Sequence, residues 1–258
     1  MSCLSFRAVL VGLFFCLSFS VQANPPLKTG VYVREGGSGT LTLKAGKKGE
    51  LAFSLDAVGV NAHTCSLEGK IRNGKALMKD DLDGGICTVT FTPHKNGIEV
   101  EGKDEDSGYE SGACRYYCGM RASFSGRYLT PRSGCSPVET RQAQQDFQRF
   151  YDAKAYKKAL ATLKPVLDKC QSVLNELYEE GRIRNDLAVT YHKLGNYRAC
   201  YAMLEPYAED AAQKEDDVGA YSYAPAERET YLLTLAAVRV NLRQCEQAEK
   251  AARRKSKQ

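Results

Sequence analysis

The chain has no apolar run long enough to cross a bilayer and only three histidines. Its longest apolar run, from Ala8 to Phe19, is shorter than the ~20 residues of a transmembrane helix. The three histidines, His63, His94 and His192, are scattered along the sequence, which argues against zinc. No Gly-x-Ser-x-Gly motif, phosphate-binding loop or paired histidine and acid is present. We therefore expect no membrane span, no cofactor or metal, and no enzymatic activity.

Residues 1–23 have the order of a secretory signal peptide. Arg7 gives a positive start, the apolar run follows, and Val21-Gln22-Ala23 offers small residues for cleavage. A lipid anchor at Cys16 is disfavoured because the bulky Phe15 precedes it. We expect a periplasmic or secreted protein with a cleaved signal peptide.

Residues 24–130 predict a small antiparallel β-barrel. Short runs alternate apolar and polar residues, which is typical of strands with one face in a core and one in water. Asn73-Gly74 and Asn96-Gly97 suit tight hairpins from Ile71 to Ala76 and from Pro93 to Ile98. A meander of this size exposes two edges unless its first and last strands pair, so we expect an up-and-down barrel or a half-open version of it. The eight runs are Val31–Val33, Thr40–Leu43, Leu51–Leu55, Cys65–Ile71, Ala76–Met78, Cys87–Phe91, Ile98–Val100 and Ala122–Tyr128.

The pattern changes after a linker at residues 131–136. Ser136 and Glu139 form a capping-box pattern, with Pro137 at the first helical position. From there to residue 258 the apolar spacing is helical, as in Leu160, Leu163 and Leu167. The whole chain is therefore predicted to be α+β, with an N-terminal barrel domain and a C-terminal helical domain.

The helical half contains an internal repeat. Ala155–Pro165 and Asn196–Pro206 align without gaps, and Asn241–Cys245 is a weaker third copy. The stretch Leu187–Cys200 resembles the core of a tetratricopeptide (TPR) repeat, in which a Leu-Gly-Asn-Tyr turn joins two helices. The other copies depart from this pattern, with Lys154 and Val240 in place of the turn glycine. The resemblance implies a helical repeat domain with a concave binding surface, and the alternative is an ordinary helical bundle.

A second resemblance concerns the barrel half. Cys114–Phe124 resembles a segment of small exported proteobacterial proteins of unassigned role. The expected barrel size and disulfide content are similar in outline to periplasmic lysozyme inhibitors, a likeness that does not fix function.

Eight cysteines follow the signal peptide, and an even set in an exported chain predicts four disulfides. We predict Cys135 with Cys170, because antiparallel helices bring those ends together. Equivalent repeat positions favour Cys200 with Cys245. In the barrel we predict the pairs Cys65 with Cys87 and Cys114 with Cys118. A redox role for Cys114 and Cys118 is disfavoured, because redox centres favour two intervening residues at a helix start and this pair has three.

The sequence therefore favours a scaffold protein that binds a protein or peptide partner in the cell envelope through its helical repeats. Alternatives are a cell-wall hydrolase inhibitor acting through a loop such as Asp104–Arg115, and a less favoured thiol-disulfide oxidoreductase. The acidic runs Lys79–Gly84 and Asp104–Gly108 lack the full ligand set of a calcium loop, and the basic C-terminal tail is expected to be a solvated end rather than a nucleic-acid site. The oligomeric state stays open. The candidate partner-binding residues are Tyr151, Tyr191, His192, Tyr201 and Tyr207.

Overall fold

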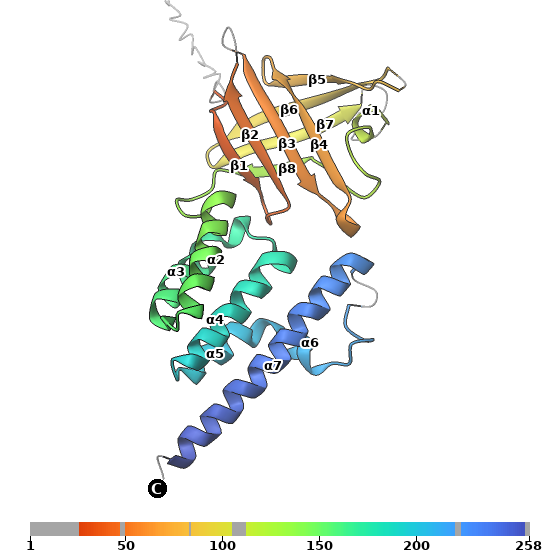
Figure 1. Cartoon of the computed structure of the whole chain (residues 1–258). Helices are drawn as coiled ribbons and strands as arrows, with labels where there is room; N and C mark the ends of the chain where they lie inside the picture. The colour runs from red at the N-terminus through yellow and green to blue at the C-terminus, as the bar shows by residue number, and fades with distance from the viewer. Residues whose placement is uncertain (1–25, 47–49, 83, 105–111, 220–222, 256–258) are drawn as a thin grey trace, which may run out of the picture.

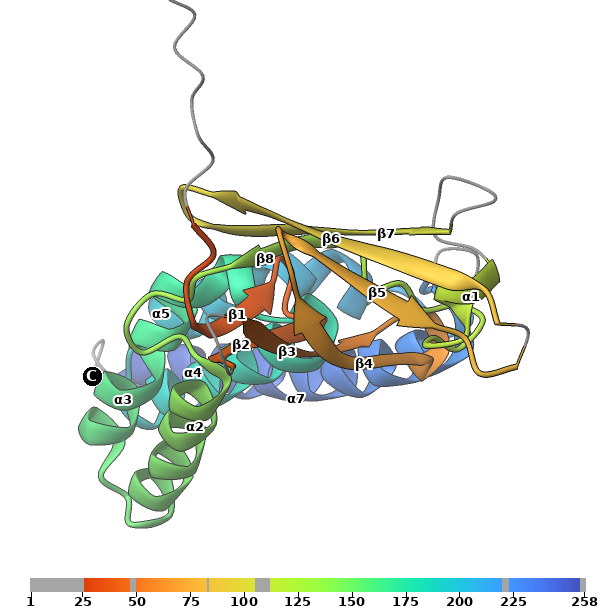
Figure 2. The same ribbon diagram turned by 90° about the horizontal axis from the view of Figure 1, so that it is seen from above.

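A nearly closed barrel of eight antiparallel strands precedes a helical region, so the predicted α+β class is confirmed. In Figure 1 the barrel lies above the helices, and the long last helix runs from beneath the barrel to the far end of the molecule. Figure 2 shows the same arrangement from above, with the strands curling around the barrel interior. The computed structural model describes residues 26–46, 50–82, 84–104, 112–219 and 223–255. The predicted signal peptide lies outside these ranges.

The strands follow one another around the barrel in the order β4-β3-β2-β1-β8-β7-β6-β5. The first and last strands pair, as predicted, with Val33 opposite Leu129 and Arg34 opposite Tyr128. Leu41, Leu55 and Val89 are fully buried in the core. The strands are β1 (Gly30–Arg34), β2 (Gly39–Ala45), β3 (Leu51–Val58), β4 (Thr64–Ile71), β5 (Lys75–Lys79), β6 (Ile86–His94), β7 (Gly97–Asp104) and β8 (Gly126–Leu129).

The last strand begins at Gly126 rather than at Ala122, where the alternating pattern starts. The Arg34 guanidinium donates to the carbonyl oxygens of Ser123 and Ser125, at 2.9 and 2.6 Å. These carbonyl oxygens therefore accept hydrogen bonds from a side chain instead of from the backbone of a neighbouring strand. The Phe124 ring is fully buried against Gly102.

The barrel stays open along a seam between β4 and β5. Asn73 and Gly74 form the predicted tight turn with positive φ angles of 51° and 75°, and one bridge pairs Arg72 with Lys75. The strand ladder does not continue beyond this bridge, because β4 and β5 stand at opposite ends of the sheet order. The predicted second hairpin forms a full ladder between β6 and β7.

The seam is covered by a segment that is tied to both of its sides. The short helix α1 (Gly112–Arg115) and the loop after it lie in this position, and the amide of Ser66 on β4 donates to the Tyr117 carbonyl at 3.0 Å. On the other side, the Tyr117 hydroxyl donates to the carbonyl of Lys79 on β5 at 2.6 Å. The cover protects strand edges that would otherwise be free to pair with another chain.

Two disulfides fasten this cover, and they correct the predicted barrel pairing. Cys118 bonds to Cys65 on β4, and Cys114 bonds to Cys87 on β6. The predicted pairs Cys65–Cys87 and Cys114–Cys118 are wrong, because β4 and β6 are separated by the open seam and the 114–118 segment bridges it. Cys114 and Cys118 thus hold two different strands rather than each other, which contradicts a local redox pair.

The helical region begins with the predicted capping box. The Ser136 hydroxyl accepts from the Glu139 amide at 3.3 Å, and the Glu139 carboxylate accepts from the Ser136 amide at 3.1 Å. The helices are α2 (Pro137–Asp152), α3 (Tyr156–Cys170), α4 (Gly181–Lys193), α5 (Tyr197–Leu204), α6 (Ala208–Ala212) and α7 (Pro225–Lys255). Three-residue 3₁₀ turns stand at η2 (Val60–Ala62), η3 (Gln171–Val173) and η5 (Glu205–Tyr207), and η4 (Glu176–Glu180) is a short π-helix. No helix among the described residues is long and apolar enough to cross a membrane.

Two helix hairpins, α2–α3 and α4–α5, correspond to the two aligned copies of the repeat. Gly195 has φ +72° in the second turn, and Lys154 adopts φ +58° at the equivalent place in the first. Lys154 therefore adopts the left-handed conformation that the turn requires, although glycine adopts this conformation more readily. The prediction of a third repeat is wrong. Asn241–Cys245 lies inside the continuous helix α7, so no turn separates two helices there.

The two disulfides predicted in the helical half are confirmed. Cys135 bonds to Cys170, and Cys200 on α5 bonds to Cys245 on α7. All eight cysteines after residue 23 are therefore in disulfides. Four disulfides indicate an oxidising, non-cytoplasmic compartment. The division into a barrel domain, a linker at 131–136 and a helical domain stays a prediction.

Candidate functional site

Among the described residues, hydrogen bonds join the barrel and the helical region at two places beside the chain that links them. At the first, the amide of Gly36 donates to the Ser172 carbonyl at 3.0 Å. Gly37 packs so closely there that a Cβ atom would lie 2.3 Å from the Asn175 nitrogen. Glycine is therefore required at this contact between the β1–β2 turn and the segment after α3.

The second contact is an exchange of hydrogen bonds between the β3–β4 loop and the start of α7, which we call the reciprocal cap. The Asn61 side-chain oxygen accepts from the Ala226 amide at 3.2 Å, and the Glu227 carboxylate accepts from the Asn61 amide at 2.5 Å. This pattern satisfies the orphan donors of a helix start, as a capping box does, but the capping residue comes from the barrel. Asn61 and Ala62 both have positive φ angles, 56° and 57°.

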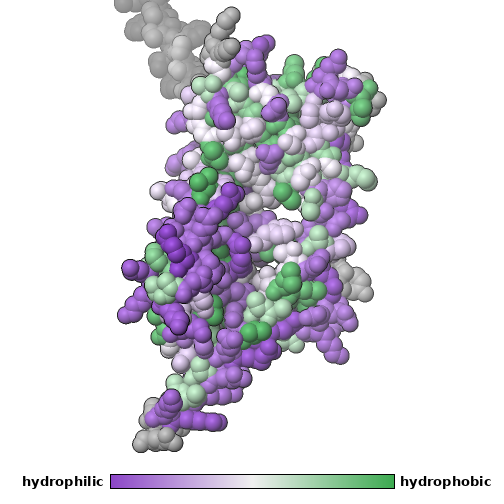
Figure 3. Space-filling view, viewed as in Figure 1, coloured by the Kyte–Doolittle hydropathy of each residue, from purple (hydrophilic) through white to green (hydrophobic). Residues whose placement is uncertain are grey.

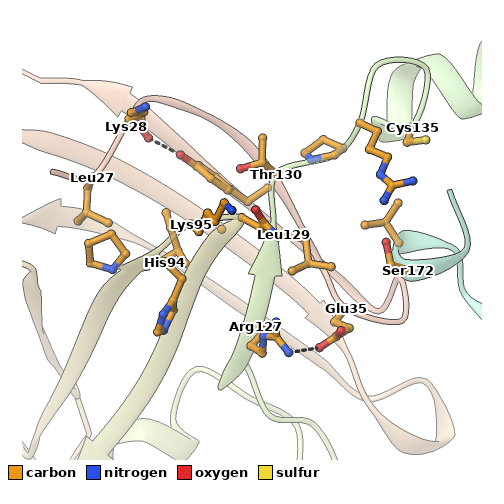
Figure 4. Close-up of a pocket in the computed structure, with 18 of the residues that line it drawn as sticks. Leu27, Lys28, Glu35, His94, Lys95, Arg127, Leu129, Thr130, Cys135 and Ser172 are labelled. Carbon is orange, nitrogen blue, oxygen red and sulfur yellow. Dashed lines mark hydrogen bonds and ion pairs between the residues drawn. The ribbon is translucent and has the colours of Figure 1, made fainter. Parts of the chain in front are cut away.

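A large cleft with a volume of about 840 Å³ opens beside the first contact. Figure 4 shows Lys28 and His94 on one side of it, Arg127 with Glu35 below, and Cys135 and Ser172 opposite. The side chains that define this cationic cleft come from five parts of the chain: the segment before β1, the β6–β7 turn, β8, the linker and α3. They are Lys28, Lys95, Arg127, Arg132 and Lys169.

The charge of the cationic cleft is strongly unbalanced. Among the described lining residues Glu35 is the one carboxylate, and it pairs with Arg127 at 3.4 Å. All five cationic side chains are solvent-exposed. The arrangement can attract and hold negative charge.

Apolar side chains lie between these charges. Leu27, Leu129 and Val173 are among the residues that form the walls, together with several prolines. The hydroxyl of the buried Tyr32 donates to the Lys28 carbonyl at 2.8 Å and steadies the segment before β1. Burial raises the pKa of Tyr32, so this phenol stays protonated as a donor. The cleft therefore offers both cationic and apolar contacts.

A smaller cavity of about 390 Å³, the junction cavity, lies between the barrel and the helices. Figure 3 shows the surface recessed in the region between the two halves. Cys135 and Val173 line both this cavity and the cationic cleft, so the two adjoin. The lining comprises Val33, Gly37, Ser38, Thr40, Val58, Ala62, Cys135, Pro137, Thr140, Val173, Asn175, Tyr178 and Glu179.

The five residues predicted to bind a partner do not form one surface. Tyr191 and Tyr207 are buried in the helical core, 8% and 6% exposed. Tyr151 packs between Phe147 and Tyr156, with ring centroids 5.7 and 5.3 Å away. None of the five lines the cationic cleft or the junction cavity. Their contact with a partner stays a prediction.

The electrostatic surroundings of these residues are those of packed side chains. Burial raises the pKa of Tyr207 to about 12, and Glu180 adds to the effect. Burial also raises the pKa of Tyr201, with a further contribution from Glu249 on α7. The pKa of His192 is lowered by burial and by Lys193, which favours the neutral imidazole. None of these shifts points to proton transfer on a ligand.

Sequence reasoning missed the cationic cleft because its residues share no local motif. They are spread from residue 28 to residue 169 and reach one place only through the fold. The formal net charge of +5 was the available signal, but a net charge does not show where the cationic side chains gather in the fold. The predicted inhibitory loop Asp104–Arg115 is described only in part, because residues 105–111 lie outside the described ranges.

Comparison of the chain with protein-family models, curated proteins and solved structures found no match.

Proposed function

We propose that this is an exported, non-enzymatic binding protein that holds an acidic segment of a partner protein in its cationic cleft. The observation that carries the proposal is the meeting of five cationic side chains from five separate parts of the chain around one 840 Å³ cleft. Such a site attracts negative charge and fixes the register of its partner.

The distribution of charge favours a peptide segment over a single small anion. A compact phosphate or carboxylate site has donors that converge on one point, whereas these cations stand on several walls with Leu27, Leu129 and Val173 between them. Carboxylates spaced along an extended chain fit such an array, and the apolar contacts in between suit the rest of the peptide.

The disulfides and the N-terminal sequence support an envelope location. We propose that residues 1–23 direct export and that the protein acts in the periplasm or outside the cell. The α2–α3 and α4–α5 hairpins support TPR-like repeats, and Lys169 near the end of α3 contributes its charge to the cationic cleft.

The proposal is tested with a fluorescein-labelled hexaglutamate peptide and a hexaglutamine peptide as its neutral match. Fluorescence anisotropy should detect binding of the acidic peptide alone, and the affinity should fall as salt is raised, because exposed charges are screened over about 8 Å at physiological ionic strength. Equal binding of the two peptides, or binding insensitive to salt, would contradict the proposal.

Charge reversal locates the site. Each exposed ion pair contributes about 0.2–1 kcal/mol, and reversal adds repulsion to the loss of attraction. We expect Lys95→Glu combined with Lys169→Glu to weaken binding by about 10-fold or more. Lys44→Glu is the matched control, because Lys44 is an exposed lysine on β2 outside the cleft, and it should change the affinity by less than about 2-fold.

One observation favours the hydrolase inhibitor as a second candidate. The segment that covers the seam, α1 and the loop after it, is fixed by two disulfides. Two of its apolar side chains are exposed, Met120 to 79% and Tyr116 to 42%. A rigid loop with exposed apolar side chains binds at a low entropic cost. If this candidate is right, the full chain inhibits a lysozyme in a cell-wall lysis assay, and Met120→Asp removes the inhibition without affecting hexaglutamate binding.

A further inference from the structure

We infer that the junction cavity holds a bulky apolar side chain of the partner whose acidic segment lies in the cationic cleft. This inference rests on the proposed function and names the partner more closely: a peptide with carboxylates beside an aromatic or large aliphatic anchor residue.

The lining of the junction cavity favours an apolar occupant. Val33, Val58 and Val173 contribute hydrophobic side chains, together with Ala62, Pro137 and the Cys135–Cys170 disulfide. The volume of about 390 Å³ falls within the range typical of ligand pockets. Val58 is 44% exposed, so a covering side chain would remove apolar surface from water.

Three polar side chains of the lining, those of Asn175, Thr140 and Glu179, already have hydrogen-bond partners within the protein. The Asn175 side-chain oxygen accepts from the amides of Leu177 and Tyr178, at 3.1 and 3.0 Å. The Thr140 hydroxyl donates to the Pro137 carbonyl at 3.3 Å. The Glu179 carboxylate accepts from the Asn175 amide at 3.0 Å. Since these groups have internal partners, an apolar side chain in the cavity would leave none of them newly unpaired.

The two sites share a wall. Cys135 and Val173 line both, and Cys135 is held by its disulfide to Cys170 at the end of α3. A peptide that places its carboxylates in the cationic cleft therefore needs to pass only this wall to place a side chain in the junction cavity. The wall is preorganised, which lowers the entropy lost on binding.

The occupant is assigned to the acidic partner because of this shared wall and the charge of the cleft. A ligand unrelated to the cleft would have to bind beside five cationic side chains, of which Arg127 is paired with Glu35. A peptide with both features neutralises the cleft and covers the apolar wall at once, as an apolar anchor in a pocket with a polar surround does at other protein interfaces.

The absence of tryptophan from the chain gives a clean optical test. Two probes are four glutamates followed by glycine and tryptophan, and the same residues in reverse order. Their matched controls carry alanine in place of tryptophan. We expect at least one tryptophan peptide to bind about 10-fold more tightly than its alanine control, with a blue shift of the tryptophan emission on binding.

Filling the cavity is the second arm. Val58→Phe should remove the tryptophan advantage and the blue shift while leaving the alanine peptides bound as before. Val31→Phe is the control, because Val31 is a similarly exposed valine, 42% against 44%, that lines neither site. The peptide comparison needs no variant, so equal binding of the tryptophan and alanine peptides overturns the inference even if Val58→Phe folds poorly.

The outcomes separate the two proposals. If the tryptophan and alanine peptides bind equally and remain salt-sensitive, the anchor inference is overturned and the cationic cleft stands. If no acidic peptide binds, the proposed function fails as well. A blue shift that survives Val58→Phe would also overturn the inference, because the tryptophan would then lie elsewhere.

Discussion

Removal of the Glu227 carboxylate should weaken the attachment of α7 to the barrel. One of its oxygens accepts from the Asn61 amide at 2.5 Å, and a hydrogen bond to a charged group contributes about 1.5–3 kcal/mol. The other oxygen is buried and has no hydrogen-bond partner among the described residues, so its removal gives back part of that loss. We expect Glu227→Ala to cost about 2 kcal/mol and to lower the melting temperature by about 4–8 °C.

Three companion variants sharpen this prediction. Glu227→Gln keeps an acceptor for the Asn61 amide and should cost about half as much as the alanine variant. Asn61→Gly removes the side-chain oxygen that caps Ala226, about 1 kcal/mol, but relieves the positive φ, so the two effects should nearly cancel. Ala62→Gly keeps every hydrogen bond and relieves the left-handed alanine at φ 57°, so it should stabilise the protein by about 0.5–1 kcal/mol.

Urea unfolding gives the free energies, and hydrogen exchange of the Asn61 and Ala226 amides reports the cap itself. A loss of 2 kcal/mol corresponds to faster opening by about 30-fold, confined to η2 and the first turn of α7 if the opening is local. The reasoning is refuted if Glu227→Ala leaves the free energy of unfolding unchanged within about 0.5 kcal/mol while Ala62→Gly destabilises the protein.

Three further predictions concern the helical region. Burial raises the pKa of Asp186 from its ordinary value of 3.8 to about 6, and the nearby Arg182 lowers this pKa in part. The folded state therefore binds the proton of Asp186 more tightly than the unfolded state does. The free energy of unfolding should rise as the pH falls from about 6 towards 4. Asp186→Asn should remove that slope in urea titrations at several pH values and stabilise the protein at pH 7 by up to about 3 kcal/mol; an unchanged slope would count against it. Replacing Cys200 and Cys245 by serine should cost about 4 kcal/mol in the chain-entropy model for a loop of 45 residues, measured by thermal unfolding, and a loss below 1 kcal/mol would contradict that view. Ser136→Ala should cost about 1 kcal/mol through loss of the N-cap, which calorimetry can check, and a neutral effect would indicate that the box is not needed.

Local signals in the sequence predicted the elements well. The period-two runs, the Asn-Gly turns and the Ser136–Glu139 box each depend on neighbouring residues, and their structures match. The Cys135–Cys170 disulfide was also predictable, because it joins the ends of two consecutive helices whose order along the chain sets their proximity.

Features that depend on long-range packing could not be read in the same way. The open seam between β4 and β5 starts from a turn whose sequence favours a full hairpin, so nothing near Asn73 signals that the strands separate. The predicted pairs Cys65–Cys87 and Cys114–Cys118 assumed a full hairpin at this turn, and they were wrong for that reason. Asn241–Cys245 carries a repeat-like pattern, but Val240 and its neighbours continue α7, because a β-branched valine stands at the position where Gly195 provides the left-handed turn.

The cationic cleft and the reciprocal cap depend entirely on contacts between residues that are far apart in the sequence. Asn61 and Glu227 are 166 positions apart, and each is an ordinary residue in its own segment. Only the docking of the two halves gives them a joint role.

The nested arrangement of the barrel disulfides has a consequence for biogenesis. Cys87–Cys114 lies inside Cys65–Cys118, whereas the helical pairs join cysteines that follow each other along the chain. An oxidase that links thiols in the order in which they emerge during translocation would join Cys65 to Cys87 first, a mispaired intermediate. For a chain exported in this way we expect the barrel to need a disulfide isomerase, whereas the helical half should mature with an oxidase alone.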